Sequence, residues 1–354
     1  MVKKKFSSIS SIIQDAKKGK MFILVDDKNR ENEGDLVIPG SKCSSKNINF
    51  MAKHGRGLIC LALSKKQIDK LKLPLMSPIN KSRMQTAFTI SIEAKRGITT
   101  GISAQDRAKT IRTAINPRVK KKDIISPGHV FPLVARNGGV LERAGHTEAS
   151  VDISRLSNLN PSSVICEVMN EDGRMARLND LFKFSKKHKI KLASIEDLIS
   201  YRLKYEKLIL RLSSKVIISN KYGKIHIYSY KNKLENNINL VISKGVLNPN
   251  KSVPVRVIST KIKNVNILNN INIKNSLRIL SKYKNFLLLI INSNETTKDY
   301  SINTLRYYGI GAQIIKDLNI KNMILISRSK KKIIGLEGFG LRIKKQIIIK
   351  WKKY

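Results

Sequence analysis

Acidic side chains are concentrated in one short segment near the start of the chain. Residues 26–35 (DDKNRENEGD) hold five carboxylates and Arg30, whereas the whole sequence of 354 residues has only 25 aspartates and glutamates. Crowded carboxylates repel one another unless water or a cation separates them. Oxygen ligands beside an arginine suit a divalent cation next to a phosphorylated or carbonyl substrate. The alternative is a solvated acidic loop, but the scarcity of acid in this sequence makes a functional loop harder to dismiss.

Two further segments present histidines in turn-forming sequence. Residues 143–148 (RAGHTE) place His146 and Thr147 next to Gly145, and His129 follows Pro-Gly ahead of an apolar run. An imidazole that titrates near neutrality can ligate a metal or transfer protons, and a threonine beside glycine N–H groups can hold phosphate oxygens. Each motif alone is weak, and an ordinary turn histidine is the better interpretation of His129 taken by itself.

A single carboxylate, Glu167, interrupts the apolar run VICEVM at residues 164–169. A charge in such a run must be paired, ligated or exposed at an edge, which makes an acid/base role plausible. The three cysteines, Cys43, Cys60 and Cys166, are too few and too scattered for a disulfide scaffold or a Cys-rich zinc site. We interpret Cys60 and Cys166 as small core residues rather than nucleophiles.

Short apolar strands and capped helices alternate over the first 200 residues, which predicts an α/β (α+β) domain with a mixed sheet and flanking helices. We expect strands at 21–25, 57–63, 87–93 and 164–169, and helices at 64–71, 103–115, 179–188 and 194–203. After residue 201 acids nearly vanish, and strands separated by Asn/Lys-rich loops predict a smaller second α/β domain. We place the domains at residues 1–203 and 204–354.

The charge of the chain is strongly positive. The sequence has 69 Lys+Arg against 25 Asp+Glu, a formal net charge of +44. Such an excess can bind nucleic acid through its phosphates, yet no zinc finger, helix-turn-helix or aromatic stacking surface accompanies the lysines. Lys, Asn and Ile are abundant together, as an A/T-rich genome favours. We therefore interpret the charge as compositional drift, and nucleic acid is not the expected partner.

The sequence also indicates a compartment. No apolar run approaches the roughly 20 residues that cross a bilayer, and the first twenty residues lack the apolar core of a secretory signal. The sparse cysteines fit a reducing environment. We expect a cytoplasmic protein with no membrane partner.

Seven motifs stand in the order found in 3,4-dihydroxy-2-butanone 4-phosphate synthases. They are RENEGD, GRGLIC, TAFTISIEA, GITTGISAQDRAKTI, PGHVFPL, GGVLERAGHTEASVDISRL and ICEVMNEDGRMAR. Residues 5–203 resemble this family almost continuously. The resemblance implies conversion of D-ribulose 5-phosphate to L-3,4-dihydroxy-2-butanone 4-phosphate and formate in riboflavin biosynthesis. It also implies Mg²⁺ or Mn²⁺ as cofactor, two ions per site, and no zinc.

The same resemblance assigns roles to individual residues. It implies that Glu31 and His146 are the metal ligands and that His129 and Glu167 are the catalytic acid/base groups. The substrate-binding residues that it implies are Arg30, Glu31, Asp35, Arg143, Ala144, Gly145, His146, Thr147 and Glu167. Members of the family are dimers with their sites at the subunit interface, so a homodimer is implied.

The second half resembles GTP cyclohydrolase II more weakly, through YGIGAQIIKDL, GLEGFG and RVIS at residues 256–259. That family holds zinc on three cysteines to generate its attacking water. This chain has no cysteine after Cys166, and Lys261 stands where the first ligand is expected. We therefore predict a degenerate domain that does not hydrolyse GTP. The alternatives are a bifunctional enzyme that also hydrolyses GTP, and a basic nucleic-acid-binding protein on an inactive scaffold.

Overall fold

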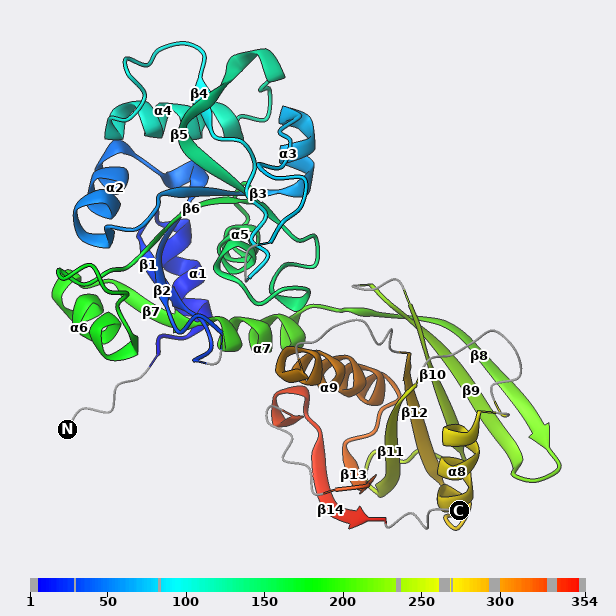
Figure 1. Cartoon of the computed structure of the whole chain (residues 1–354). Coiled ribbons are helices and arrows are strands. Elements are labelled where there is room, and N and C mark those ends of the chain that lie inside the picture. The colour runs from blue at the N-terminus through cyan, green and yellow to red at the C-terminus, as the bar shows by residue number, and fades with distance from the viewer. Residues whose placement is uncertain are drawn as a thin grey trace. The chain divides into compact units, whose positions relative to one another are not determined.

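The protein is described by a computed structural model, in which the chain divides into two compact units, Met1–Ile199 and Ser200–Tyr354 (Figure 1). The described residues are 6–28, 30–81, 84–233, 237–260, 268, 270–292, 300–329 and 336–349, with the backbone alone described for 300–306, 337 and 338. Each unit contains a seven-stranded sheet with both parallel and antiparallel pairs. This confirms the expected α/β class with mixed sheets. Within the described residues, no helix combines the length and the apolar character that a membrane crossing requires.

The first unit alternates helices with strands. Its strands are β1 (Phe22–Val25), β2 (Gly34–Pro39), β3 (Cys60–Ser64), β4 (Ile92–Ala94), β5 (Ile124–Ala135), β6 (Ser162–Glu167) and β7 (Lys191–Ser194). Its helices are α1 (Ile9–Lys17), α2 (Ser45–Phe50), α3 (Lys65–Leu71), α4 (Ala104–Ile115), α5 (His146–Leu156) and α6 (Leu178–His188), and α7 (Ile195–Tyr205) continues into the second unit.

Serine side chains start several of these helices. Ser64 accepts a hydrogen bond from the backbone N–H of Gln67 at the start of α3, and Ser103 accepts one from Asp106 at the start of α4. Each bond satisfies one of the N–H groups that a helix leaves free in its first turn. Both caps confirm the helix starts expected from the sequence.

The two faces of the first sheet bury different side chains, because neighbours along a strand point to opposite faces. The strand order is β4-β5-β3-β6-β2-β1-β7. Leu36 and Cys166 lie in the core cluster that also holds residues of α2, α3 and α4. Helix α5 packs on the other face, where its Val151 meets Ala62 of β3. Asp35 precedes Leu36 in β2, so its side chain points to the opposite face, the one covered by α5.

The strands of the first unit differ from the expectation in two ways. The strand expected over 87–93 is wrong in its first part: Phe88 and Thr89 form only isolated bridges, and the regular strand β4 begins at Ile92. The partner there is Pro132, which accepts the N–H of Thr89 but has no N–H to return, so the ladder is interrupted. Strands β2, β5 and β7 were not anticipated, although all six residues of β2 are buried.

The second unit is built on strands in the order β14-β13-β11-β12-β10-β9-β8. They are β8 (Ile209–Ser219), β9 (Gly223–Asn232), β10 (Ile238–Lys244), β11 (Ser252–Thr260), β12 (Phe286–Asn292), β13 (Asn322–Ser327) and β14 (Arg342–Ile348). Helix α8 (Ile271–Leu280) packs on one face and α9 (Tyr300–Asp317) on the other, since their buried residues belong to separate clusters.

Candidate active site

Asp26 folds the acidic loop that follows β1. One of its carboxylate oxygens accepts the N–H of Glu31 at 3.1 Å and the guanidinium of Arg30 at 2.8 Å, and the other accepts the N–H of Glu33 at 2.9 Å. Asp26 is 7% exposed, so these bonds compensate the burial of its charge. The side chain of Arg30 also pairs with Glu31. The loop is thus closed around Asp26, and Glu31 is held by both its backbone and its side chain.

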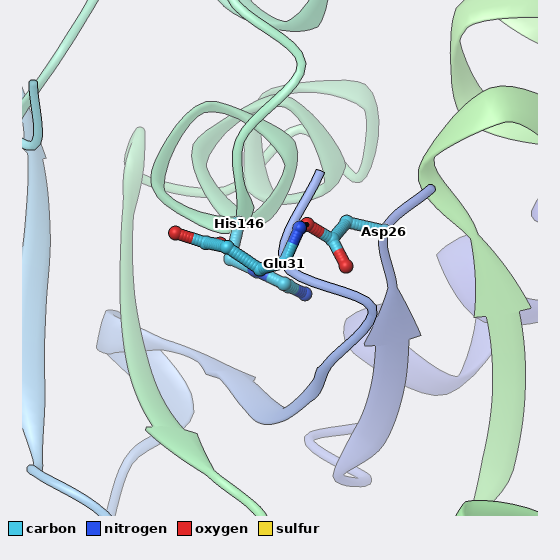
Figure 2. A group of neighbouring side chains, drawn as sticks. All are labelled: Asp26, Glu31 and His146. Atoms are coloured by element: carbon cyan, nitrogen blue, oxygen red, sulfur yellow. Dashed lines mark hydrogen bonds and ion pairs between the residues drawn. The ribbon is translucent and has the colours of Figure 1, made fainter. Parts of the chain in front are cut away.

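His146 is the first residue of α5, and its side chain lies next to Glu31 of this loop (Figure 2). Its Nδ1 lies 3.7 Å from Oε2 of Glu31, and its Nε2 lies 3.8 Å from Oδ1 of Asp35. Asp26, Glu31 and His146 offer ligand atoms that all lie within 4.8 Å of one another. Residues that are more than a hundred positions apart in sequence therefore converge on one point.

The strand register brings Asp35 and Glu167 together. Asp35 of β2 is paired directly with Glu167 of β6, and both point to the α5 face. Oε2 of Glu167 accepts the N–H of Leu58 at 2.8 Å, so this carboxylate is anchored at the start of the β3 segment. Gly57 leaves no room for a side chain at this point, because a Cβ there would lie 2.6 Å from Oε2 of Glu167.

The charged groups in this cluster shift the pKa values of one another strongly. Burial raises the pKa of Glu31, but His146 and Arg30 outweigh it and hold the pKa at about 2. Burial lowers the pKa of His146, yet Asp35 and Glu31 outweigh it and raise the pKa to about 9. For Asp35 burial dominates, with help from the charges of Glu167 and Glu31, and raises the pKa to about 7 despite His146. The cluster therefore has an excess of negative charge that a proton on His146 only partly balances.

Two buried polar atoms at the centre of the cluster lack a hydrogen-bond partner. They are Oδ1 of Asp35 and Nε2 of His146, in residues that are 3% and 6% exposed. Buried polar atoms are rarely left unsatisfied in native proteins, and such atoms commonly mark the place of an ion, a water molecule or a ligand. A carboxylate oxygen and an imidazole nitrogen that face each other suit a divalent cation.

His129 lies at the same end of the strands as the cluster, but on β5, which is farther along the sheet. Cys60 of β3 is paired with Phe131 of β5 on one side and with Ile165 of β6 on the other. His129 is two residues from Phe131, and Glu167 is two residues from Ile165, so the two lie at the same level along the strands. Two strands, β3 and β6, separate β5 from β2. At about 4.8 Å per strand, the backbone at His129 lies about 14 Å from the backbone at Asp35. Its ring pairs with Glu93 instead.

Arg143 has its guanidinium engaged within the chain. It donates to Oε2 of Glu148 at 2.6 Å, to the carbonyl of Met84 at 2.9 Å and to the hydroxyl of Thr86 at 3.1 Å. Arg143 thereby connects the 84–86 segment to the first turn of α5. Ala144, Gly145 and Thr147 are its near neighbours in the chain, and Gly145 is the N-cap of α5, which has no side-chain cap. The N-terminus of α5, an end of a helix that favours negative charge, therefore lies at the cluster.

The structure thus brings together most of the residues expected from the sequence. Arg30, Glu31, Asp35, His146 and Glu167 form one cluster with the start of α5, whereas His129 lies apart. Asp26 was not among the expected site residues, although its position directly after an apolar strand was a usable signal. The buried thiols of Cys60 and Cys166 lie near Glu167 and Asp35, and burial raises their pKa, which disfavours a thiolate nucleophile.

Comparison with known families divides the chain as the fold does. The family model for 3,4-dihydroxy-2-butanone 4-phosphate synthase matches residues 10–201, and that for GTP cyclohydrolase II matches residues 269–348. Riboflavin biosynthesis protein RibBA of Aquifex aeolicus (strain VF5) is 42% identical over 379 residues, which cover 98% of this chain and 93% of the relative. The 3,4-dihydroxy-2-butanone 4-phosphate synthase of Photobacterium phosphoreum is 42% identical over 360 residues, covering 95% of this chain and 98% of the relative.

Solved structures give the same picture. The crystal structure of RibBX, a two-domain 3,4-dihydroxy-2-butanone 4-phosphate synthase from A. baumannii, matches with a TM-score of 0.82 at 38% identity, covering 97% of this chain and all of that one. A 3,4-dihydroxy-2-butanone 4-phosphate synthase in complex with two magnesium ions matches 57% of this chain and 99% of its own, with a TM-score of 0.54 at 38% identity.

Proposed function

The chain belongs to the 3,4-dihydroxy-2-butanone 4-phosphate synthase family and is a lyase of riboflavin biosynthesis, and we propose that it converts D-ribulose 5-phosphate to L-3,4-dihydroxy-2-butanone 4-phosphate and formate. The observation that carries this proposal is the convergence of Glu31, Asp35 and His146 around two unsatisfied buried atoms. This arrangement has the donor atoms, the burial and the negative charge that a dication beside a phosphoketose needs.

We assign Glu31 and His146 as ligands of Mg²⁺ or Mn²⁺. A divalent cation supplies the positive charge that stabilises an oxyanion developing on the C2 ketone when a proton leaves the neighbouring carbon. Oxygen ligands suit both metals, and the imidazole is more favourable for Mn²⁺. The solved relative with two magnesium ions supports a two-ion site. We propose that this site does not use zinc. Cation binding would also return Asp35 to its charged form, because an adjacent positive charge lowers a carboxyl pKa.

The remaining residues bind the substrate around this centre. We assign Arg30 and the residues from Arg143 to Thr147 at the start of α5 to substrate binding, because guanidinium groups and a helix N-terminus suit phosphate and hydroxyl oxygens. The side chain of Arg143 orders the 84–86 segment at the same time. We also assign Asp35 to substrate binding, because its buried carboxylate lies in the cluster beside Glu167.

We assign proton transfer to Glu167 and His129. Glu167 is fixed beside Asp35 by the Leu58 N–H and is therefore close to any substrate held by the cluster. Two strands separate the backbone of His129 from that of Asp35 in the same chain, and its ring is engaged with Glu93. We propose a homodimer with its sites at the subunit interface, in which His129 serves the cluster of the other protomer. We also propose that the enzyme works in the cytoplasm.

The test is formate release from ribulose 5-phosphate. We expect formate in the presence of Mg²⁺ or Mn²⁺, loss of the activity with EDTA, and recovery when either metal is restored. Absence of formate with both metals, from protein that is folded by circular dichroism, would contradict the proposal. Size-exclusion chromatography with light scattering tests the homodimer separately.

We propose that residues 204–354 form a GTP cyclohydrolase II-like domain that is inactive, and that residues 1–203 carry the synthase. Arg256 of the RVIS segment is 3% exposed and donates to Ser276 and to the carbonyl of Ile326, so it ties α8 to the sheet. Lys261 lies outside the described residues. The support for inactivity is the absence of any cysteine after Cys166. Zinc-dependent formation of the ring-opened GTP product by the purified protein would contradict it.

A further inference from the structure

Glu93 of β4 faces His129 of β5. One carboxylate oxygen of Glu93 contacts Nδ1 of His129, and the two side chains differ in exposure: 12% for Glu93 and 45% for His129. A carboxylate this deeply buried needs a hydrogen-bonded or charged partner. Within the described residues, His129 is the side chain that provides one. The imidazole therefore has an inner nitrogen bound to Glu93 and an outer part that faces solvent.

The tight approach of the two strands fixes this pair. Gly128 of β5 donates its N–H to the hydroxyl of Ser91 at 3.1 Å, and the hydroxyl of Ser126 donates to the carbonyl of Ser91 at 2.6 Å. A Cβ on Gly128 would lie 2.6 Å from the backbone nitrogen of Glu93, so a side chain at this position is excluded. The backbones on both sides of the Glu93–His129 contact are therefore anchored to each other.

A turn at Gly101 packs against the carboxylate of Glu93. Gly101 has φ +92, and a Cβ there would overlap the carboxylate of Glu93 and lie 2.8 Å from Nδ1 of His129. Asp106 at the start of α4 holds this turn, because its Oδ2 accepts the hydroxyl of Thr99 at 2.7 Å and the N–H of Gly101 at 3.0 Å. The turn is thus built to admit Glu93 and to hold it against the imidazole.

We propose that Glu93 is a positioning residue for His129 in the synthase reaction, an inference that rests on the proposed function. An ionised carboxylate only accepts hydrogen bonds, so Glu93 keeps the proton of the neutral imidazole on Nδ1. The lone pair is then on Nε2, the outer nitrogen, which can take a proton from a substrate. Glu93 also stabilises the imidazolium that forms when Nε2 is protonated.

The first experiment is a double-mutant cycle on formate release. We expect Glu93→Gln to lower kcat by about ten- to a hundredfold, with the KM for ribulose 5-phosphate within about twofold of wild type. In a His129→Ala background the same substitution should have no further effect on kcat, because there is no imidazole left to position. Glu93→Asp should recover part of the loss. Asp69→Asn, which removes an exposed carboxylate on α3, is the matched control and should leave kcat unchanged.

The second experiment does not depend on activity. Long-range ¹H–¹⁵N NMR reports the tautomer of each histidine, and the chain has only five. The signal of His129, assigned by its loss in His129→Ala, should show the proton on Nδ1 in the wild-type protein and a changed tautomer population in Glu93→Gln.

Equal losses of kcat from Glu93→Gln in both backgrounds, unchanged kcat, or a wild-type His129 protonated on Nε2 would each overturn the inference. If the wild-type protein releases no formate, the proposed function fails, and the NMR result still decides whether Glu93 sets the tautomer.

Discussion

Glu167 lies between the backbone at Leu58 and Asp35 of the acidic cluster. Its Oε2 accepts the N–H of Leu58, while its strand partner is Asp35. We expect Glu167→Gln to lower kcat by about 10²- to 10⁴-fold, because a glutamine cannot exchange a proton. The amide oxygen of glutamine can still accept the Leu58 N–H, so the free energy of unfolding should change by no more than about 1 kcal/mol. Kinetics of formate release and urea unfolding measure the two quantities.

A matched control lies four residues further along the chain. Glu171 is 84% exposed in its side chain and pairs with Arg56 at 3.5 Å, so Glu171→Gln should leave kcat unchanged. If Glu167→Gln retains normal kcat, or if the control is equally slow, the acid/base assignment of Glu167 is wrong.

The residue types in the sequence indicated which side chains converge, but not the hydrogen bonds that hold the acidic loop. The scarcity of acid in the sequence drew attention to the loop after β1, and Glu31, Asp35 and His146 do converge in the structure. The organising role of Asp26 was missed, because it depends on three hydrogen bonds that exist only once the loop has closed. Side-chain chemistry can be read from a sequence, whereas such bonds depend on a backbone path.

At the scale of elements, the turn at residues 99–101 before α4 is expected to stabilise the fold and to hold Glu93 against His129. The hydroxyl of Thr99 and the N–H of Gly101 bind Asp106 and hold its pKa below the usual 3.8. A depressed carboxyl pKa stabilises the fold above the pKa of the unfolded chain, and this contribution disappears as the pH falls through the folded-state value. Asp106→Asn should therefore lower the free energy of unfolding at pH 7, and the difference from wild type should shrink below about pH 4.

Urea unfolding at a series of pH values measures this difference, with Asp69→Asn as a control that should show little effect at any pH. A difference between Asp106→Asn and wild type that stays constant from pH 7 to pH 3 would show that the charge of Asp106 does not hold the turn.

Some elements could be read from the sequence and others could not. The helices capped by Ser64 and Ser103 carry their start signals locally, so their expected positions were right. Strand β2 has the sequence GDLVIP, in which a carboxylate and a proline obscure the strand pattern. Its identity as a buried strand comes from pairing with β1 and β6, which are adjacent to it only in the fold. The start expected for the β4 strand at residue 87 was wrong for a similar reason, because the interruption comes from Pro132, a partner that is distant in sequence.

At the scale of the whole molecule, the charge of +44 predicts a weak affinity for polyanions rather than a specific function. Binding that rests on phosphate contacts falls steeply with salt, by about 10³-fold or more between 50 and 200 mM for six or more contacts. We expect any DNA complex in a gel-shift titration to disappear over this range and to show no sequence preference. A complex that survives 200 mM salt with a preferred sequence would support the nucleic-acid alternative.

The central claim is that Glu31 and His146, separated by more than a hundred residues, bind one dication. Its most direct test is Mn²⁺ binding to the metal-free protein, followed by the electron paramagnetic resonance signal of free Mn²⁺. We predict that wild type and Glu171→Gln bind Mn²⁺ equally, and that Glu31→Gln and His146→Ala each weaken binding by more than about tenfold. Undiminished Mn²⁺ affinity in folded Glu31→Gln protein would contradict the account.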